Sequence, residues 1–345
     1  MAWYNNDANK DSNILWSRSR IYRNIDDLEF SSIKDMKKYT AISANICELL
    51  SKNGFHASEE SDGIGYVKYA ELGYINSGFV SSEYPKALYL NEPCSLSVAI
   101  GGEDFICINS LLPSLSLQET YKSAIEVECL IDSSFDFAYF EDIGYISPNI
   151  KYTGHGVSLS VALFLPAVAK LSEIKKIKKK AISQGYSFNP MTVYDKNAGD
   201  FFVLEYIPDI HTDMELAIRR MGDFIKYIIS LEKEYENNVF GDNTAVLNKA
   251  WRSFGMMEYS SSISEEELLN LLSSIRLVHS IGCADMLPYP LDIGRINTLQ
   301  TELMDTYIHS SLKESVITLK NCDRHRAKQL NECIKSFKIE KGSVS

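Results

Sequence analysis

Two arginines separated by a single residue, Arg18 and Arg20, are the first candidates for chemistry in this chain. In an extended segment, residues two apart project to the same side, so both guanidinium groups would share one face. Guanidinium groups present planar, bidentate donors that match phosphate oxygens, which makes the pair a candidate polyphosphate site. The alternative is a solvated or salt-bridged face, since such pairs often arise by chance.

Carboxylates and glycines supply two further candidates. Glu103 and Asp104 follow two glycines in a tight turn between short β-rich runs. A carboxylate there could orient a cationic substrate or act as a base; alternatively, Asp104 shapes the turn and Glu103 is solvated. Farther on, Gly154-His155-Gly156 precedes an apolar run. A glycine-rich loop that leads into a helix can cradle phosphate through its backbone N–H groups.

The sequence shows no pattern of metal ligands. His155 and the other histidines have no partner at ligand spacing, and the seven cysteines are scattered without a CxxC pair. This pattern argues against a metal site and a disulfide framework. It favours free, mostly buried thiols in a reducing compartment. The GxSxG and Walker A sequences are also absent.

The charge balance limits the partners. The 345-residue chain has 46 acidic and 35 basic residues, a net charge of −11, so we expect no nucleic-acid partner. The lysine-rich run 175–180 is then most simply a solvated helix end, with a patch for an acidic protein as the alternative. The longest apolar stretch, 157–169, is shorter than the roughly 20 residues that span a bilayer, and the N-terminus has no secretory signal pattern. We therefore expect no membrane partner and a cytoplasmic location.

The elements that must position these residues are predicted to be mixed at first and helical later. Helical spacing predicts helices over 35–52, 116–131, 158–180 and 213–235. β-rich runs predict strands over 95–100 and 105–108, paired as a hairpin, and over 200–207. After a polar stretch at 236–244, a capping box at Ser264 predicts a helix over 265–274, and more helices are expected near 291–311 and 323–337. We therefore predict an α+β domain over 1–238 and a helical C-terminal domain over 239–345.

Several segments, taken in order, resemble the guanidino phosphotransferases, the family of arginine and creatine kinases, and in particular its bacterial protein-arginine kinase branch of the McsB type. In the first half of the chain, 14–24 (ILWSRSRIYRN) resembles SSRxRxxRN, 101–109 (GGEDFICIN) resembles NEEDHxRxQ, and 144–167 resembles GYLTSCPTNxGTGxRASVMxHLPA. In the second half, 199–218 resembles the GNxFQxSNQ strand with its helix, 251–257 resembles RSYGxL, and 322–327 resembles RDxxRA.

This resemblance implies a fold, a reaction and a set of site residues. The fold would be a guanidino-kinase-like antiparallel sheet flanked by helices, followed by an all-helical C-terminal domain. The reaction would move the γ-phosphoryl group of ATP, with Mg²⁺, to a guanidinium nitrogen. By position, Glu103 matches the catalytic carboxylate, while Asp323 and Arg326 match part of a phosphoarginine site. The positions that match nucleotide-binding segments are Ser17, Arg18, Arg20, Ser158 and Ser160.

The chain departs from the family pattern at several charged positions. Cys107 and Ser158 stand where the motifs have phosphate-binding arginines. The segment 188–194 aligns with the RGxxGEG loop, but Phe188 and Val193 replace its arginine and second catalytic glutamate. Smaller departures are Gly73 at the place of a histidine near the nucleotide, Asn149 at the place of a cysteine, and Cys322 at the first arginine of RDxxRA. Because the loss of one preorganised transition-state donor commonly lowers the rate by about 10²–10³, we expect little catalysis.

The resemblance leaves three functional interpretations. The first is a degenerate pseudokinase with a binding or regulatory role. It would form a homodimer through the helical tail and have an active arginine kinase, a zinc-containing activator or a Clp-type protease component as partner. The second is an active ATP:protein-arginine phosphotransferase in which Lys151, Lys196 or His155 replaces the missing arginines. The third is a sensor of phosphoarginine or another anion at Asp323 and Arg326, which could equally be an ordinary i,i+3 helix pair.

Overall fold

The computed structural model describes residues 4, 11–26, 28, 36–59, 63–193, 196–312 and 319–342. These residues form two compact units. The first contains the described residues within 16–161 and 205–224, and the second contains those within 4–15, 162–204 and 225–345. The sequence-predicted boundary between residues 238 and 239 stays a prediction.

The strands pair in the order β2-β3-β4-β5-β1-β8-β10-β9. Their bounds are β1 Ile14–Arg23, β2 Phe55–Ala57, β3 Ala87–Asn91, β4 Leu96–Ile100, β5 Ile106–Pro113, β8 Val157–Phe164, β9 Ser187–Val193 and β10 Lys196–Tyr206. The ladders from β2 to β1 are antiparallel, and in the β1–β5 ladder Arg20 lies opposite Asn109. The predicted hairpin around the Gly101-Gly102 turn is confirmed, since β4 and β5 pair antiparallel from Ile100 and Ile106 outward.

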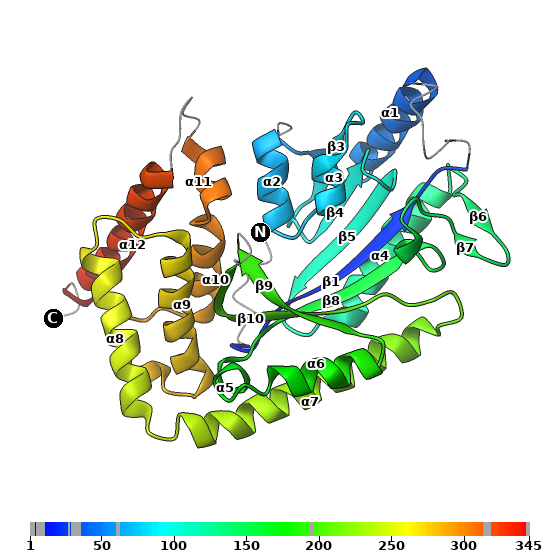
Figure 1. The fold of residues 1–345 in the computed structure, drawn as a ribbon. Helices are drawn as coiled ribbons and strands as arrows, with labels where there is room; N and C mark the ends of the chain where they lie inside the picture. The colour runs from blue at the N-terminus through cyan, green and yellow to red at the C-terminus, as the bar shows by residue number, and fades with distance from the viewer. Residues whose placement is uncertain are drawn as a thin grey trace. The chain divides into compact units, whose positions relative to one another are not determined.

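Helices cover the strands of the first unit (Figure 1). They are α1 Met36–Lys52, α2 Gly63–Glu71, α3 Ser77–Ser81 and α4 Leu117–Asp132. Helix α4 packs on β5, and Ser19 of β1 shares a buried hydrogen bond of 2.8 Å with Thr120 of α4. A small second sheet pairs β6 Tyr139–Phe140 with β7 Gly144–Tyr145, and a 3₁₀ turn, η3, spans Ile150–Tyr152. The α+β class, an antiparallel sheet flanked by helices, is confirmed.

The second unit is mostly helical. Its helices are α5 Pro166–Lys170, α6 Ile174–Ser183, α8 Asn243–Tyr259, α9 Glu265–Ser280, α10 Ile293–Glu302, α11 Asp305–Leu312 and α12 Leu319–Gly342, with a 3₁₀ turn, η4, over Ala284–Met286. Helix α7 (Met214–Val239) contributes residues to both units. Helix α8 packs on α9 and on α12 (Figure 1). The predicted cap is confirmed, because the Ser264 hydroxyl accepts the N–H of Glu267, but α9 runs beyond residue 274.

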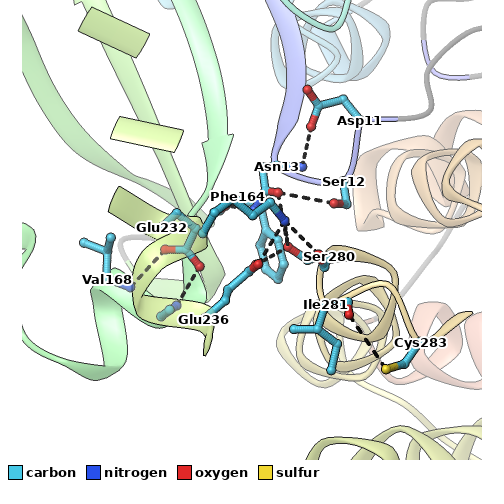
Figure 2. A network of polar contacts seen from close by, with 12 residues as sticks. Asp11, Ser12, Asn13, Phe164, Val168, Glu232, Glu236, Ser280, Ile281 and Cys283 are labelled. Carbon is cyan, nitrogen blue, oxygen red and sulfur yellow. Dashed lines mark hydrogen bonds and ion pairs between the residues drawn. The ribbon is translucent and has the colours of Figure 1, made fainter. Parts of the chain in front are cut away.

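A buried polar network lies within the second unit (Figure 2). The carboxylate of Glu232 accepts the backbone N–H groups of Ala167 and Val168 at 2.8 and 2.9 Å, at the start of α5. Its neighbour Glu236 binds the hydroxyl of Ser280. Burial raises the pKa of Glu232 to about 7, although both N–H bonds oppose this shift.

Two sequence expectations about helices are wrong. The stretch predicted as a helix over 158–180 begins as strand β8, and only α5 and α6 follow. All eight residues of β8 are buried. Its sequence, VSLSVALF, alternates only over the first five residues and then continues as an apolar run into α5, which hid the strand. The stretch near 291–311 is two helices, α10 and α11, rather than one.

None of the described helices is long and apolar enough to cross a membrane.

Candidate functional site

Strand β1 carries the two candidate arginines within the first unit. The Nε group of Arg18 donates to the Ser160 hydroxyl at 3.1 Å, and its guanidinium lies 4.8 Å from the centre of the Trp16 ring. Burial, and then the like charge of Arg20, lower the pKa of Arg18 to about 9. This value stays above neutral pH, so the structure brings two positive charges together, as their spacing predicted.

Arg20 is buried and its hydrogen bonds go to its own chain. Its Nε donates to the Asn109 side-chain oxygen at 3.2 Å. Its Nη2 donates to the backbone carbonyls of Gly73 and Ile75 at 3.1 and 2.7 Å. These acceptors take three of its five N–H groups, so Arg20 ties β1 to the segment between α2 and α3 and has only Nη1 left for another acceptor.

Gly73 allows this segment to approach β1. Its backbone has φ +84°, a conformation that favours glycine, and a Cβ there would lie 3.4 Å from Nη1 of Arg18. A larger side chain at this position would therefore press on Arg18, and the loop as folded offers two carbonyl oxygens to Arg20.

An apolar cluster surrounds Cys107, at a position where an arginine was expected. The buried members of this cluster are Tyr22, Tyr66, Ile75, Phe79, Leu88, Ala99 and Cys107. Tyr152 of η3 stacks on Tyr22 with ring centroids 3.8 Å apart. Burial raises the pKa of the Cys107 thiol to about 11, so it is neutral at physiological pH and supplies no charge to an anion.

A carboxylate occupies the surroundings of Ser158. The Ser158 hydroxyl donates to Oε1 of Glu205 at 3.4 Å, and Nζ of Lys151 lies 3.4 Å from Oε2. The negative charge of Glu205 also acts on Arg18, whose pKa it raises in opposition to burial. A carboxylate of the protein itself, that of Glu205, therefore lies near Arg18.

The turn before β5 separates the two acidic candidates. Asp104 is buried and accepts the side-chain N–H of Asn24 at 2.8 Å, while the Asn24 oxygen accepts the N–H of Phe105 at 2.8 Å. Burial raises the pKa of Asp104. Glu103 is exposed beside α3, where a Cβ on Gly78 would lie 3.5 Å from its Oε2. Asp104 therefore shapes the turn, and Glu103 is open to a cationic group.

Other sequence candidates lie apart from this group. Ser17 points to the other side of β1, where its hydroxyl donates to the Ser114 carbonyl at 2.7 Å and accepts the N–H of Ser116 at 3.0 Å. His155 contacts the Thr212 carbonyl at 2.9 Å through Nε2. The side chain of Lys196 lies outside the described residues.

The prediction that the 154–156 loop feeds a helix is wrong. The loop leads into strand β8, so it has no helix dipole with which to hold phosphate. Gly154 instead exchanges two backbone hydrogen bonds with Tyr145, at 2.8 and 3.0 Å. The Gly156 carbonyl accepts the N–H of Tyr22 at 2.8 Å. The backbone groups of this loop therefore bind the β6–β7 sheet and β1.

Arg326 has a structural place in the second unit. It has 0% exposure, and it donates to the carbonyls of Leu303 and Ile263 at 2.7 and 2.6 Å. It also pairs with Asp323 at 2.9 Å and with buried Asp305. These bonds join α12 to the starts of α9 and α11 and occupy most of the guanidinium donors. The phosphoarginine role of Asp323 and Arg326 stays a prediction.

Sequence reasoning missed Glu205, Tyr22 and Tyr152. A signal for Glu205 existed, since it stands at the serine of the GNxFQxSNQ pattern in a segment already predicted as a strand. The stacking of Tyr22 on Tyr152 had no local signal. Among the described residues, no group of three or more His, Cys, Asp and Glu is placed to hold a metal ion.

Comparisons with known proteins match both parts of the chain. The model of the ATP:guanido phosphotransferase C-terminal catalytic domain matches residues 34–235, and that of the protein-arginine kinase McsB C-terminal domain matches residues 243–343. A protein-arginine kinase of Clostridium novyi is 25% identical over 98% of this chain and 99% of its own length. One of Halothermothrix orenii is 24% identical over 78% of this chain and 79% of its own length.

Two solved structures share the fold. The duplicated taurocyamine kinase from Schistosoma mansoni aligns with a TM-score of 0.57 and 16% identity, over 74% of this chain and 38% of that chain. Lombricine kinase aligns with a TM-score of 0.55 and 13% identity, over 68% of this chain and 70% of that chain. The fold expected from the sequence motifs is confirmed.

Proposed function

The chain belongs to the ATP:guanido phosphotransferase family, and from that premise we propose that it is a protein-arginine-kinase-like protein that does not transfer phosphate and acts by binding. The observation that carries this proposal is the pairing of Arg20 with the carbonyls of Gly73 and Ile75. Three of the five N–H groups of Arg20, those on Nε and Nη2, are held by acceptors of the protein, so only Nη1 is left to face a nucleotide.

The residues present do not fit Mg²⁺ and ATP. A triphosphate needs converging positive charge in a water-poor site. Here Cys107 is a neutral thiol in an apolar cluster, and Ser158 donates to the carboxylate of Glu205. A phosphate beside Arg18 would meet that carboxylate as a like charge, which opposes binding.

The alternative interpretation, an active kinase, has one observation in its favour. Lys151 reaches Glu205, so a cation is present near Ser158. However, Lys151 pairs with Glu205, so the two together add no net positive charge where the family pattern has an arginine. We therefore rank the binding protein first.

The proposed role is regulatory within an arginine-phosphorylation system. A copy that keeps the fold but lacks turnover could bind an active arginine kinase, its zinc-containing activator or a Clp-type protease component. These partners are what the resemblance to the protein-arginine kinase branch implies; the relatives themselves are named only protein-arginine kinases.

A phosphotransfer assay tests this function. Purified protein is incubated with Mg-ATP and an arginine-rich protein, and acid-labile phosphate on the product is measured. We expect no phosphoarginine above the level without the protein. Turnover that disappears in the Glu103→Gln variant would overturn the proposal, because Glu103 is the exposed carboxylate of the site.

A further inference from the structure

The hairpin β6–β7 exposes an unusual combination of side chains in the first unit. Its turn is closed by the N–H of Ile143 and the carbonyl of Phe140 at 3.1 Å, which puts Glu141 and Asp142 at the tip. Phe140 is 61% exposed, Ile143 50% and Tyr139 52%. Both tip carboxylates are also exposed. Acidic and apolar side chains therefore face solvent together on one turn.

The base of this hairpin is held by close contacts within the first unit. Gly144 has φ +86°, and a Cβ there would lie 2.5 Å from the carbonyl oxygen of Gly154, so the two backbones are in close contact. The guanidinium of Arg23 lies 3.4 Å from the centre of the Tyr145 ring, and Arg23 also forms a buried ion pair of 2.6 Å with Glu128. A preordered tip loses little conformational entropy when it binds, which favours its use as a docking element.

Helix α6 in the second unit presents the complementary side chains. Lys175, Lys179 and Ile182 lie at i, i+4 and i+7, so they share one face, and all three are exposed. The other lysines of the helix have partners: Lys176 pairs with Glu173, Lys178 with Asn189, and Lys180 lies over the Tyr227 ring. Within the part of the chain that the structure describes, Lys175 and Lys179 have none.

We propose that the hairpin tip of one copy of this chain docks on helix α6 of a second copy. Glu141 and Asp142 pair with Lys175 and Lys179, and Phe140 and Ile143 cover Ile182. Both halves of the contact are on the same chain, and the two carboxylates of the hairpin match the two lysines of the helix in number, which favours a second copy over an unrelated protein. The contact does not depend on whether the protein transfers phosphate.

Sedimentation velocity of the full chain over a range of concentrations tests the contact. We compare the wild type with a hairpin variant, Glu141→Lys/Asp142→Lys, a helix variant, Lys175→Glu/Lys179→Glu, and the chain carrying all four changes. Each double variant should weaken self-association at least about tenfold, since like charges then face each other. The fourfold variant, and an equimolar mixture of the two double variants, should regain association close to the wild type.

The control is Glu119→Lys/Glu126→Lys on exposed positions of α4, which makes the same change in net charge as the hairpin variant and should leave association unchanged. Thermal melts confirm that the variants fold. A monomeric wild type, or loss of association that the fourfold variant does not restore, would overturn the proposal. Loss in the hairpin variant alone would also overturn it, because the hairpin would then dock on another surface.

Discussion

Replacement of Arg20 by alanine distinguishes a structural arginine from a phosphate-binding one. In this protein the change leaves three buried acceptors without donors: the carbonyls of Gly73 and Ile75 and the side-chain oxygen of Asn109. Each buried unsatisfied group costs about 1–3 kcal/mol, offset in part because a buried charge is also removed. We expect the free energy of unfolding to fall by about 3–5 kcal/mol.

Urea denaturation followed by circular dichroism measures this change. Arg220→Ala, at an exposed position of α7, is the matched control and should alter stability by less than about 0.5 kcal/mol. Arg20→Lys keeps the charge but loses the planar guanidinium that reaches three acceptors, so its free energy of unfolding should lie between those of Arg20→Ala and Arg220→Ala. If Arg20→Ala cost less than about 1 kcal/mol while it abolished binding of ATP, the arginine would serve a ligand and our reasoning would be refuted.

Three other variants test the account of the two units. Arg326→Ala should lower the free energy of unfolding by about 3–5 kcal/mol, because it removes the buried ion pair with Asp305 and the donors to the carbonyls of Leu303 and Ile263. Arg252→Ala on α8 is its exposed control, and equal stability of the two variants would show that Arg326 is dispensable. The pKa of Glu232 is about 7 in the folded chain against 4.5 in the unfolded chain, so the native state binds more protons. The contribution of this group to stability therefore falls as pH rises from about 4.5 to 7. Glu232→Gln should remove this fall of the melting temperature with pH, and an unchanged pH dependence would contradict the assignment. Gly144→Ala should destabilise the folded chain by about 2 kcal/mol or more, because a Cβ there would meet the Gly154 carbonyl. Gly255→Ala, in α8 with open space around it, should stabilise the folded chain by about 0.4–1 kcal/mol. Calorimetric melting temperatures that move in the same direction for both variants would count against this contrast.

Local patterns in the sequence predicted the elements that depend on local chemistry. The β4–β5 hairpin followed from β-rich runs around two glycines, and the start of α9 followed from Ser264 and the glutamates after it. Strand β8 was mistaken for a helix because it is buried on both faces: the alternation of its first five residues, VSLSV, gives way to an apolar run that continues into α5.

The partners of the site residues could not be predicted in the same way. Arg20 binds carbonyl oxygens 53 and 55 residues away, and every residue of the chain has such a carbonyl, so no side-chain pattern marks them. Glu205 lies 47 residues from Ser158, and their contact depends on how the strands are ordered. The sequence could show that phosphate-binding arginines are replaced, but only the fold shows which groups fill their place.

Isothermal titration of Mg-ATP into the purified chain is the decisive measurement, because every catalytic interpretation requires this binding. We expect no saturable heat up to millimolar ATP, since Nε and Nη2 of Arg20 are held by acceptors of the protein and Glu205 opposes a phosphate beside Arg18. Saturable binding that is lost in Arg18→Ala, a change at a partly exposed arginine, would contradict it.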